Sequence, residues 1–257
     1  MKDKRKIFGR LILVLVGVFA LCGIAFKLYT DRYYHEDTAI TGAIAEEYAD
    51  VVNSYSDDNG MVFLPKDGDY KAVIVFYPGG KVEYTAYSGL LYELSAEGYI
   101  CLLPRMPENL AFLQMNAVDG IKERHPEEIA MVESLDWYLA GHSLGGVAAC
   151  SYLQEHLDEY AGVILCASYP SVDLSDANLR FLSIYGSNDG VLNLSKYKKN
   201  QKYWPADSEE YVIQGGVHAY FGSYGQQQGD GKAKISNEQQ IKKTVEIISE
   251  WMKDVEE

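Results

Sequence analysis

The sequence predicts a doubly wound α/β domain with a mostly parallel sheet, preceded by an N-terminal transmembrane helix. Two patterns carry this prediction. From residue 61 onward, apolar runs alternate with longer segments of helical periodicity, which is typical of a parallel sheet with helices on both faces. Residues 1–29 combine a basic cluster with an uncharged apolar run, which is typical of a membrane anchor.

The anchor prediction depends on where the charges lie. Lys2, Lys4, Arg5, Lys6 and Arg10 precede an uncharged run over residues 11–26. Flanking apolar residues extend that run toward the roughly 20 residues that a membrane span needs. The positive-inside rule then predicts a single-pass protein with a cytoplasmic N terminus and an extracytoplasmic domain. A cleaved signal peptide, which would leave a secreted protein, is the alternative.

The chain is long enough for one large domain with a short appendage. We expect residues 1–29 to form the tail and anchor, residues 30–59 a stalk with a short helix, and residues 60–257 the α/β domain. The net charge of −14 disfavours nucleic acid as a partner. The four cysteines form no CxxC pair and no cluster with histidine, so we expect neither a metal site nor a disulfide framework, and no cofactor is indicated.

The expected elements of the domain alternate along the chain. Strands are expected at residues 61–64, 72–77, 99–103, 135–140, 162–167, 181–185 and 210–213, and helices at 84–97, 116–124, 145–157, 196–204 and from Ser236 onward. The run AVIVFY at residues 72–77 is typical of a strand buried on both faces. Ser236 and Gln239 have capping-box spacing. Ligands of such sheets bind at the carboxyl ends of the strands, so polar motifs there are the candidates for function.

The first such motif is Gly141-His142-Ser143-Leu144-Gly145, which matches the G-x-S-x-G nucleophile elbow. A serine on a sharp strand-to-helix turn needs strained backbone angles, and the residues two before and two after it approach each other closely. Glycine avoids the clash. The expected strand before the motif and the expected helix after it supply the required context.

An acid and a histidine follow in the order that the elbow requires. Asp189 lies in the loop after the strand expected at residues 181–185, and His218 follows the last expected strand. His218 is the only histidine C-terminal to that acid. The back-up acids are Asp173, Asp176 and Asp207, and the histidines expected to be non-catalytic are His35, His125, His142 and His156.

With these motifs in place, the chain resembles the α/β-hydrolase superfamily from about Met61 to Trp251. It most resembles the small, lidless, membrane-tethered members of Gram-positive bacteria, the fold-5 type. The resemblance rests on YPGGKVE at residues 77–83, on the elbow, and on residues 186–190 and 216–225. It implies Ser143 as nucleophile, His218 as base and Asp189 as acid.

The chemistry of these residue types agrees with those roles. His218 would take the Ser143 proton and Asp189 would orient the imidazole. The oxyanion needs N–H donors, and we expect them at Leu144 and at Gly80, although Pro78 stands where the family usually has a histidine before the glycines. Lys81 and His142 are candidates for lining the substrate pocket, and a surface position is the alternative for Lys81.

The substrate class follows from the short connection between the strands expected at 162–167 and 181–185. It leaves no room for a helical lid, so we expect an open cleft for a small-molecule ester or other acyl compound, processed through an acyl-enzyme. The alternatives are amidase, peptidase or acyltransferase chemistry on the same triad, and a non-catalytic scaffold used for binding.

Overall fold

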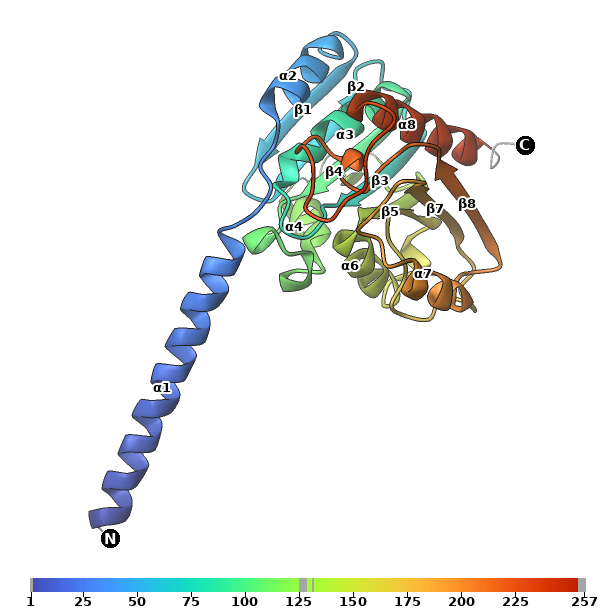
Figure 1. Cartoon of the computed structure of the whole chain (residues 1–257). Coiled ribbons are helices and arrows are strands. Elements are labelled where there is room, and N and C mark those ends of the chain that lie inside the picture. The colour runs from blue at the N-terminus through green and yellow to red at the C-terminus, as the bar shows by residue number, and fades with distance from the viewer. Residues whose placement is uncertain (1, 125–128, 131, 254–257) are drawn as a thin grey trace. The chain divides into compact units, whose positions relative to one another are not determined.

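The computed structural model describes residues 2–124, 129–130 and 132–253. The chain separates into two units, Met1–Tyr33 and Tyr34–Glu257 (Figure 1). The first unit is helix α1, Lys2–Thr30. Its segment Leu11–Thr30 has 20 residues, and its most apolar 18-residue window has a mean hydropathy of 2.6 with no buried residue. It is long and apolar enough to cross a membrane, a property that anchors and signal sequences have in common.

The second unit is built on an eight-stranded sheet in the order β1-β2-β4-β3-β5-β6-β7-β8. The strands are β1 Val52–Asp57, β2 Gly60–Pro65, β3 Ala72–Tyr77, β4 Tyr99–Pro104, β5 Trp137–His142, β6 Gly162–Cys166, β7 Arg180–Gly186 and β8 Asp207–Ile213. The β1–β2 and β2–β4 pairs are antiparallel, and the five remaining pairs are parallel. The predicted α/β fold with a mostly parallel sheet is therefore confirmed.

Strand β3 shows why the apolar runs become central strands. It lies between β4 and β5 and pairs with both in parallel, and all six of its residues are buried. A strand that packs against helices on both faces has no side for polar residues. Its carboxyl end, at Tyr77, lies opposite Gly141 of β5, so the first glycine-rich loop begins beside the strand that leads to Ser143.

Two apolar clusters cover the two faces of the sheet, and Figure 1 shows the helices that pack beside it. One cluster includes residues of α2 Thr38–Glu47, α3 Ser88–Ala96 and α8 Asn237–Lys253. The other includes residues of α4 Ala117–Arg124 and α6 Leu144–Leu153, while α7 Leu194–Asn200 follows β7. Helix α8 starts with the predicted capping box, because the Gln239 N–H donates to Ser236 Oγ and Gln239 Oε1 accepts from the Ser236 N–H.

The structure differs from the expected boundaries at several elements. Residues 30–59 were expected to form a stalk with a short helix. The short helix is present as α2, but β1 also lies there, and both elements belong to the same compact unit as the sheet. Strand β1 is polar and mostly exposed, so its sequence lacks the apolar alternation of a half-buried strand. The expected strand at 135–140 is β5 Trp137–His142, which continues to the residue before Ser143.

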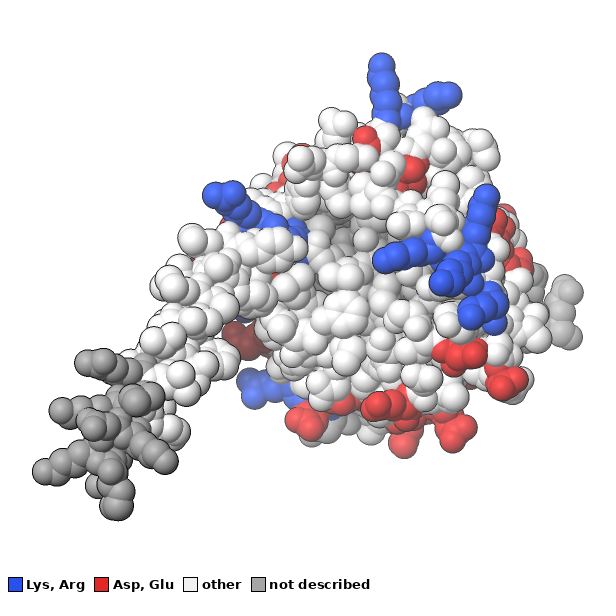
Figure 2. All heavy atoms as spheres, turned by 60° about the horizontal axis from the view of Figure 1, so that its bottom comes forward, with Lys and Arg blue, Asp and Glu red and all other residues white. Residues whose placement is uncertain are grey.

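Charged side chains are unevenly spread over the surface of the chain. On the face drawn in Figure 2, lysine and arginine form separate groups, acidic residues gather along one margin, and the middle of the face is mostly uncharged.

Candidate active site

Ser143 stands on a strained turn between β5 and α6. Its φ of 52° and ψ of −120° lie in a region that residues other than glycine rarely adopt, at a cost on the order of 1–3 kcal/mol. A Cβ at Gly141 would lie 2.7 Å from a backbone nitrogen of α6, and a Cβ at Gly145 would lie 2.2 Å from the carbonyl oxygens of Tyr77 and Pro78. Both glycines are therefore required for close approach of the backbone, as the sequence motif predicts.

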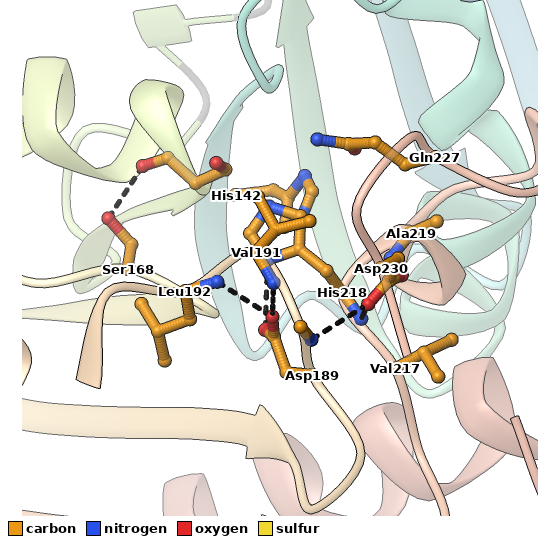
Figure 3. Close-up of polar contacts among 12 residues, drawn as sticks. His142, Ser168, Asp189, Val191, Leu192, Val217, His218, Ala219, Gln227 and Asp230 are labelled. Carbon is orange, nitrogen blue, oxygen red and sulfur yellow. Dashed lines mark hydrogen bonds and ion pairs between the residues drawn. The ribbon is translucent and has the colours of Figure 1, made fainter. Parts of the chain in front are cut away.

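Two hydrogen bonds hold this turn against strand β6 and the residues after it. The Ser143 N–H donates to the Cys166 carbonyl at 2.9 Å, and the buried Ser168 hydroxyl donates to the Ser143 carbonyl at 2.6 Å (Figure 3). Gly146 leaves space for that hydroxyl, since a Cβ there would lie 2.6 Å from Ser168 Oγ. Sequence reasoning missed Ser168, because a serine that bonds a backbone carbonyl has no motif of its own.

Asp189 and His218 form a buried pair at the carboxyl edge of the sheet. His218 Nδ1 lies 2.8 Å from Asp189 Oδ2, and the two side chains are 2% and 1% exposed. Asp189 Oδ1 accepts from the N–H groups of Val191 and Leu192 at 2.8 and 2.7 Å (Figure 3). These donors orient the carboxylate, and because a carboxylate only accepts hydrogen bonds, Nδ1 is the ring nitrogen that donates to it.

The other ring nitrogen, His218 Nε2, has no hydrogen-bond partner among the described residues. No hydrogen bond joins it to Ser143 Oγ in this structure. The ring centroid of His142, the residue before Ser143, lies 4.6 Å from the ring centroid of His218. In free enzymes such bonds are often long and shorten only when substrate binds.

The turn after β3 presents one uncommitted N–H. The Gly79 N–H donates to the Tyr87 hydroxyl at 3.0 Å and the Lys81 N–H donates to the Asn109 carbonyl at 2.8 Å. The Gly80 N–H between them donates to no described residue. Lys81 itself has a φ of 60°, so the turn is held in a left-handed conformation by the bonds on either side.

Gly80 and Leu144 lie against each other. A Cβ at Gly80 would come within 2.6 Å of Leu144 Cδ2, and Leu144 is the first residue of α6. The first N–H groups of a helix have no partner within it. The two expected oxyanion donors therefore lie on adjacent backbone segments, one in each loop beside Ser143.

His142, an expected pocket residue, is buried rather than exposed in a pocket. Its Nδ1 lies 2.8 Å from the Tyr87 hydroxyl, and its ring contacts those of His218 and Phe221. Burial, with a further contribution from His218, lowers the pKa of His142 well below its ordinary value. His142 is thus a neutral group packed behind His218.

A short N-terminal segment closes one side of the site. The Tyr34 N–H donates to the Lys81 carbonyl at 2.8 Å, the Glu83 N–H donates to the Tyr34 carbonyl at 2.9 Å, and the Asp37 N–H donates to the Ser223 carbonyl at 2.8 Å. Residues 34–37 therefore bind both the turn after β3 and the segment after His218. We call these residues the strap; they were expected to belong to the stalk.

The remaining candidates contact other partners. The contacts are Asp173 with Ser175, Asp207 with Arg180, His35 with Glu83 and His156 with Glu159. Asp176 is exposed, and His125 lies outside the described residues. Within the described part of the chain, no group of His, Cys, Asp and Glu could hold a metal ion. The segment 220–230, which follows His218, contributes buried Phe221, Ser223 and Tyr224.

The fold and the strained serine turn define a class, that of α/β proteins with a nucleophile elbow at the carboxyl edge of a parallel sheet. The family model described as alpha/beta hydrolase family matches residues 73–242, and the chain belongs to this family of hydrolases. A search of curated proteins gives no match to the chain.

Proposed function

We propose that the chain is a serine hydrolase that acts on carboxylic esters through Ser143, His218 and Asp189. The observation that carries this proposal is the buried Asp189–His218 pair, which leaves His218 Nε2 without a hydrogen-bond partner among the described residues, in a fold whose strained turn presents Ser143. A serine is a weak nucleophile without a base, and a histidine held by a carboxylate through Nδ1 offers Nε2 as that base.

The proposed reaction has two halves. Ser143 Oγ attacks the ester carbonyl carbon while its proton passes to His218 Nε2. The tetrahedral oxyanion accepts hydrogen bonds from the N–H groups of Gly80 and Leu144 and then collapses. The alcohol leaves with the proton from His218, and the acyl group stays on Ser143. Water then attacks the acyl-enzyme, again with His218 as base, and the acid product leaves.

Gly80 is supported as the second oxyanion donor by the bonds of its neighbours. The N–H groups of Gly79 and Lys81 are committed to Tyr87 and Asn109, so only the N–H of Gly80 in this turn is left for a substrate. Preorganised donors cost no rearrangement when the charge develops. Removing one such donor typically costs about 10²–10³ in kcat.

The substrate proposal is a modest ester in an open cleft. Only residues 167–179 join β6 to β7, and no helix is formed there. That connection is too short to fold over the site as a helical lid. We therefore expect activity on soluble short-chain esters without activation by an oil–water interface.

The location proposal rests on the charge asymmetry of the N terminus and on the apolar helix. We propose a single-pass membrane protein whose hydrolase domain lies outside the cytoplasm, with cleavage and secretion as the alternative. Protease treatment of intact cells should degrade the domain. A domain that is protected in intact cells and degraded after lysis would contradict the orientation, and a domain found in the medium would indicate cleavage.

Labelling with a fluorophosphonate probe tests the function. Wild type should label and Ser143→Ala should not. Ser151→Ala is the matched control, since Ser151 lies on the same helix and its hydroxyl donates to the Val147 carbonyl within that helix, so this variant should label normally. Absence of labelling in wild type would favour a non-catalytic scaffold. Labelling followed by turnover of p-nitrophenyl amides, but not of esters, would overturn the choice of ester.

A further inference from the structure

The carboxylate of Asp230 ties together the two loops that carry the proposed acid and base. Within the described part of the chain, its Oδ1 accepts from the N–H groups of Gly190, His218 and Gly231 at 3.1, 3.1 and 2.8 Å. Its Oδ2 accepts from the Ala219 N–H at 2.9 Å. Figure 3 shows Asp230 beside His218 and Ala219, with Asp189 in the adjoining loop.

The donors lie at positions that matter for the reaction. Gly190 directly follows Asp189, and His218 is the proposed base itself, so a single side chain binds the backbone of both loops. A carboxylate suits this position, because it offers two oxygens that only accept hydrogen bonds. Charged acceptors also make shorter and stronger bonds to N–H groups than neutral ones do.

The segment around Asp230 packs closely on the acid loop. A Cβ at Gly190 would lie 2.5 Å from the Gly229 carbonyl oxygen, and a Cβ at Gly231 would lie 1.8 Å from the Asn188 carbonyl oxygen. Glycines on both sides therefore let the two backbones meet. This close approach brings the Asp230 carboxylate within reach of the Gly190 N–H.

We propose that Asp230 is a positioning residue that holds the Asp189 loop and the His218 loop in the register in which the acid meets Nδ1 of the imidazole. This inference rests on the proposed function of Ser143, His218 and Asp189. Asp230 acts on the reaction through the backbone of the two loops. Losing it should displace the imidazole, and displacements on the order of 1 Å in an active site can cost about 10²-fold in rate.

The test compares Asp230→Ala and Asp230→Asn with wild type in the full-length chain. The asparagine keeps one acceptor oxygen and places an NH₂ group where the second acceptor was. We expect kcat on p-nitrophenyl acetate to fall about 30- to 300-fold in Asp230→Ala and about 3- to 30-fold in Asp230→Asn, with KM within about threefold in both. Asp173→Ala is the matched control, because among the residues that the structure describes Asp173 accepts only from Ser175 in its own turn, and the kcat of this variant should be unchanged.

A second measurement is independent of turnover. The Nδ1–H proton of His218, bonded to Asp189, should give a low-field proton resonance in wild type and in Asp173→Ala. That resonance should be lost or weakened in the Asp230 variants. Wild type with the resonance but without fluorophosphonate labelling would end the proposed function while leaving the positioning role standing.

Two results would overturn the inference. The first is Asp230→Ala with wild-type kcat and an unchanged resonance. If Asp230→Ala does not fold, Asp230→Asn is measured in its place. A folded Asp230→Asn with unchanged kcat and resonance would show that the carboxylate does not position the pair.

Discussion

Replacing Gly145 by alanine should damage the nucleophile turn by a purely steric route. The added Cβ would lie 2.2 Å from two carbonyl oxygens, those of Tyr77 and Pro78. Ordinary contacts between carbon and a carbonyl oxygen are about 3.3 Å or longer, so the backbone must separate by about 1 Å. Neither oxygen belongs to a flexible side chain, and β3 is buried on both faces, so the collision cannot be relieved by a rotamer change.

The expected magnitude follows from that overlap. Overpacking of a rigid interior usually costs about 1–3 kcal/mol and occasionally more. Because Gly145 meets backbone on both sides, we expect Gly145→Ala to lower the free energy of unfolding by at least about 3 kcal/mol. Displacement of Ser143 by about 1 Å should also slow fluorophosphonate labelling by about 10²-fold.

The matched control is Gly42→Ala, because a Cβ at Gly42 would meet nothing within 4 Å. Gly42 lies inside α2, where alanine is favoured over glycine by about 0.5–1 kcal/mol. Both substitutions restrict the unfolded chain equally, so the difference between the two variants isolates the collision. Urea unfolding of the full chain in detergent micelles measures both. A Gly145→Ala protein within about 1 kcal/mol of wild type that labels at the normal rate would refute this reasoning.

Three other predictions concern buried polar groups. Burial raises the pKa of Glu93 from 4.5 to about 7, so the folded chain holds a proton that the unfolded chain releases, and stability should fall as pH rises through that window. In urea unfolding, the free energy of unfolding of Glu93→Gln should exceed that of wild type by on the order of 1–3 kcal/mol at pH 8 and should equal it at pH 4. Equal stability of the two proteins at both pH values would contradict the raised pKa of Glu93. Burial keeps His142 neutral, so below about pH 6.5 the unfolded chain takes up a proton that the folded chain does not. As the pH falls through that range, the free energy of unfolding of wild type should decrease by up to about 1.4 kcal/mol per pH unit, and that of His142→Gln should decrease less. The same dependence of the free energy of unfolding on pH in both proteins would show that His142 is not the group that takes up the proton. Ser168→Ala removes the donor to the Ser143 carbonyl and should lower the free energy of unfolding by about 1–2 kcal/mol, with slower labelling, whereas labelling at the wild-type rate would argue against a role for Ser168 in holding the turn.

The sequence was sufficient for the parts of the fold that have local signatures. Strand β3 was predicted to the residue, because burial on both faces leaves an unbroken apolar run. The turn of Ser143 was predicted because its geometry demands glycine at two fixed positions. The capping box of α8 was predicted for a similar reason, since only certain side chains at that spacing can bond both backbone groups.

Other parts carry no such signature. Strand β1 is polar and pairs at the edge of the sheet through backbone groups that every residue has, and only Asp58 and Asn59 join it to β2. Asp230 and Ser168 bond backbone atoms of residues far away in sequence. Which backbone groups come near them depends on the packed loops, so neither residue could be assigned before the structure.

The strap sets the limits within which helix α1 can be removed without changing the bonds of the second unit. A peptidase that cuts anywhere before Tyr34 leaves the bonds of Tyr34 and Asp37 to the loops around the site intact. A cut beyond Asp37 removes them, and a cut near residue 60 also removes the edge strand β1. A shed form that keeps all of these bonds must therefore begin at or before Tyr34, and a recombinant version that starts at the first strongly apolar strand, β2, would lack the strap, α2 and β1.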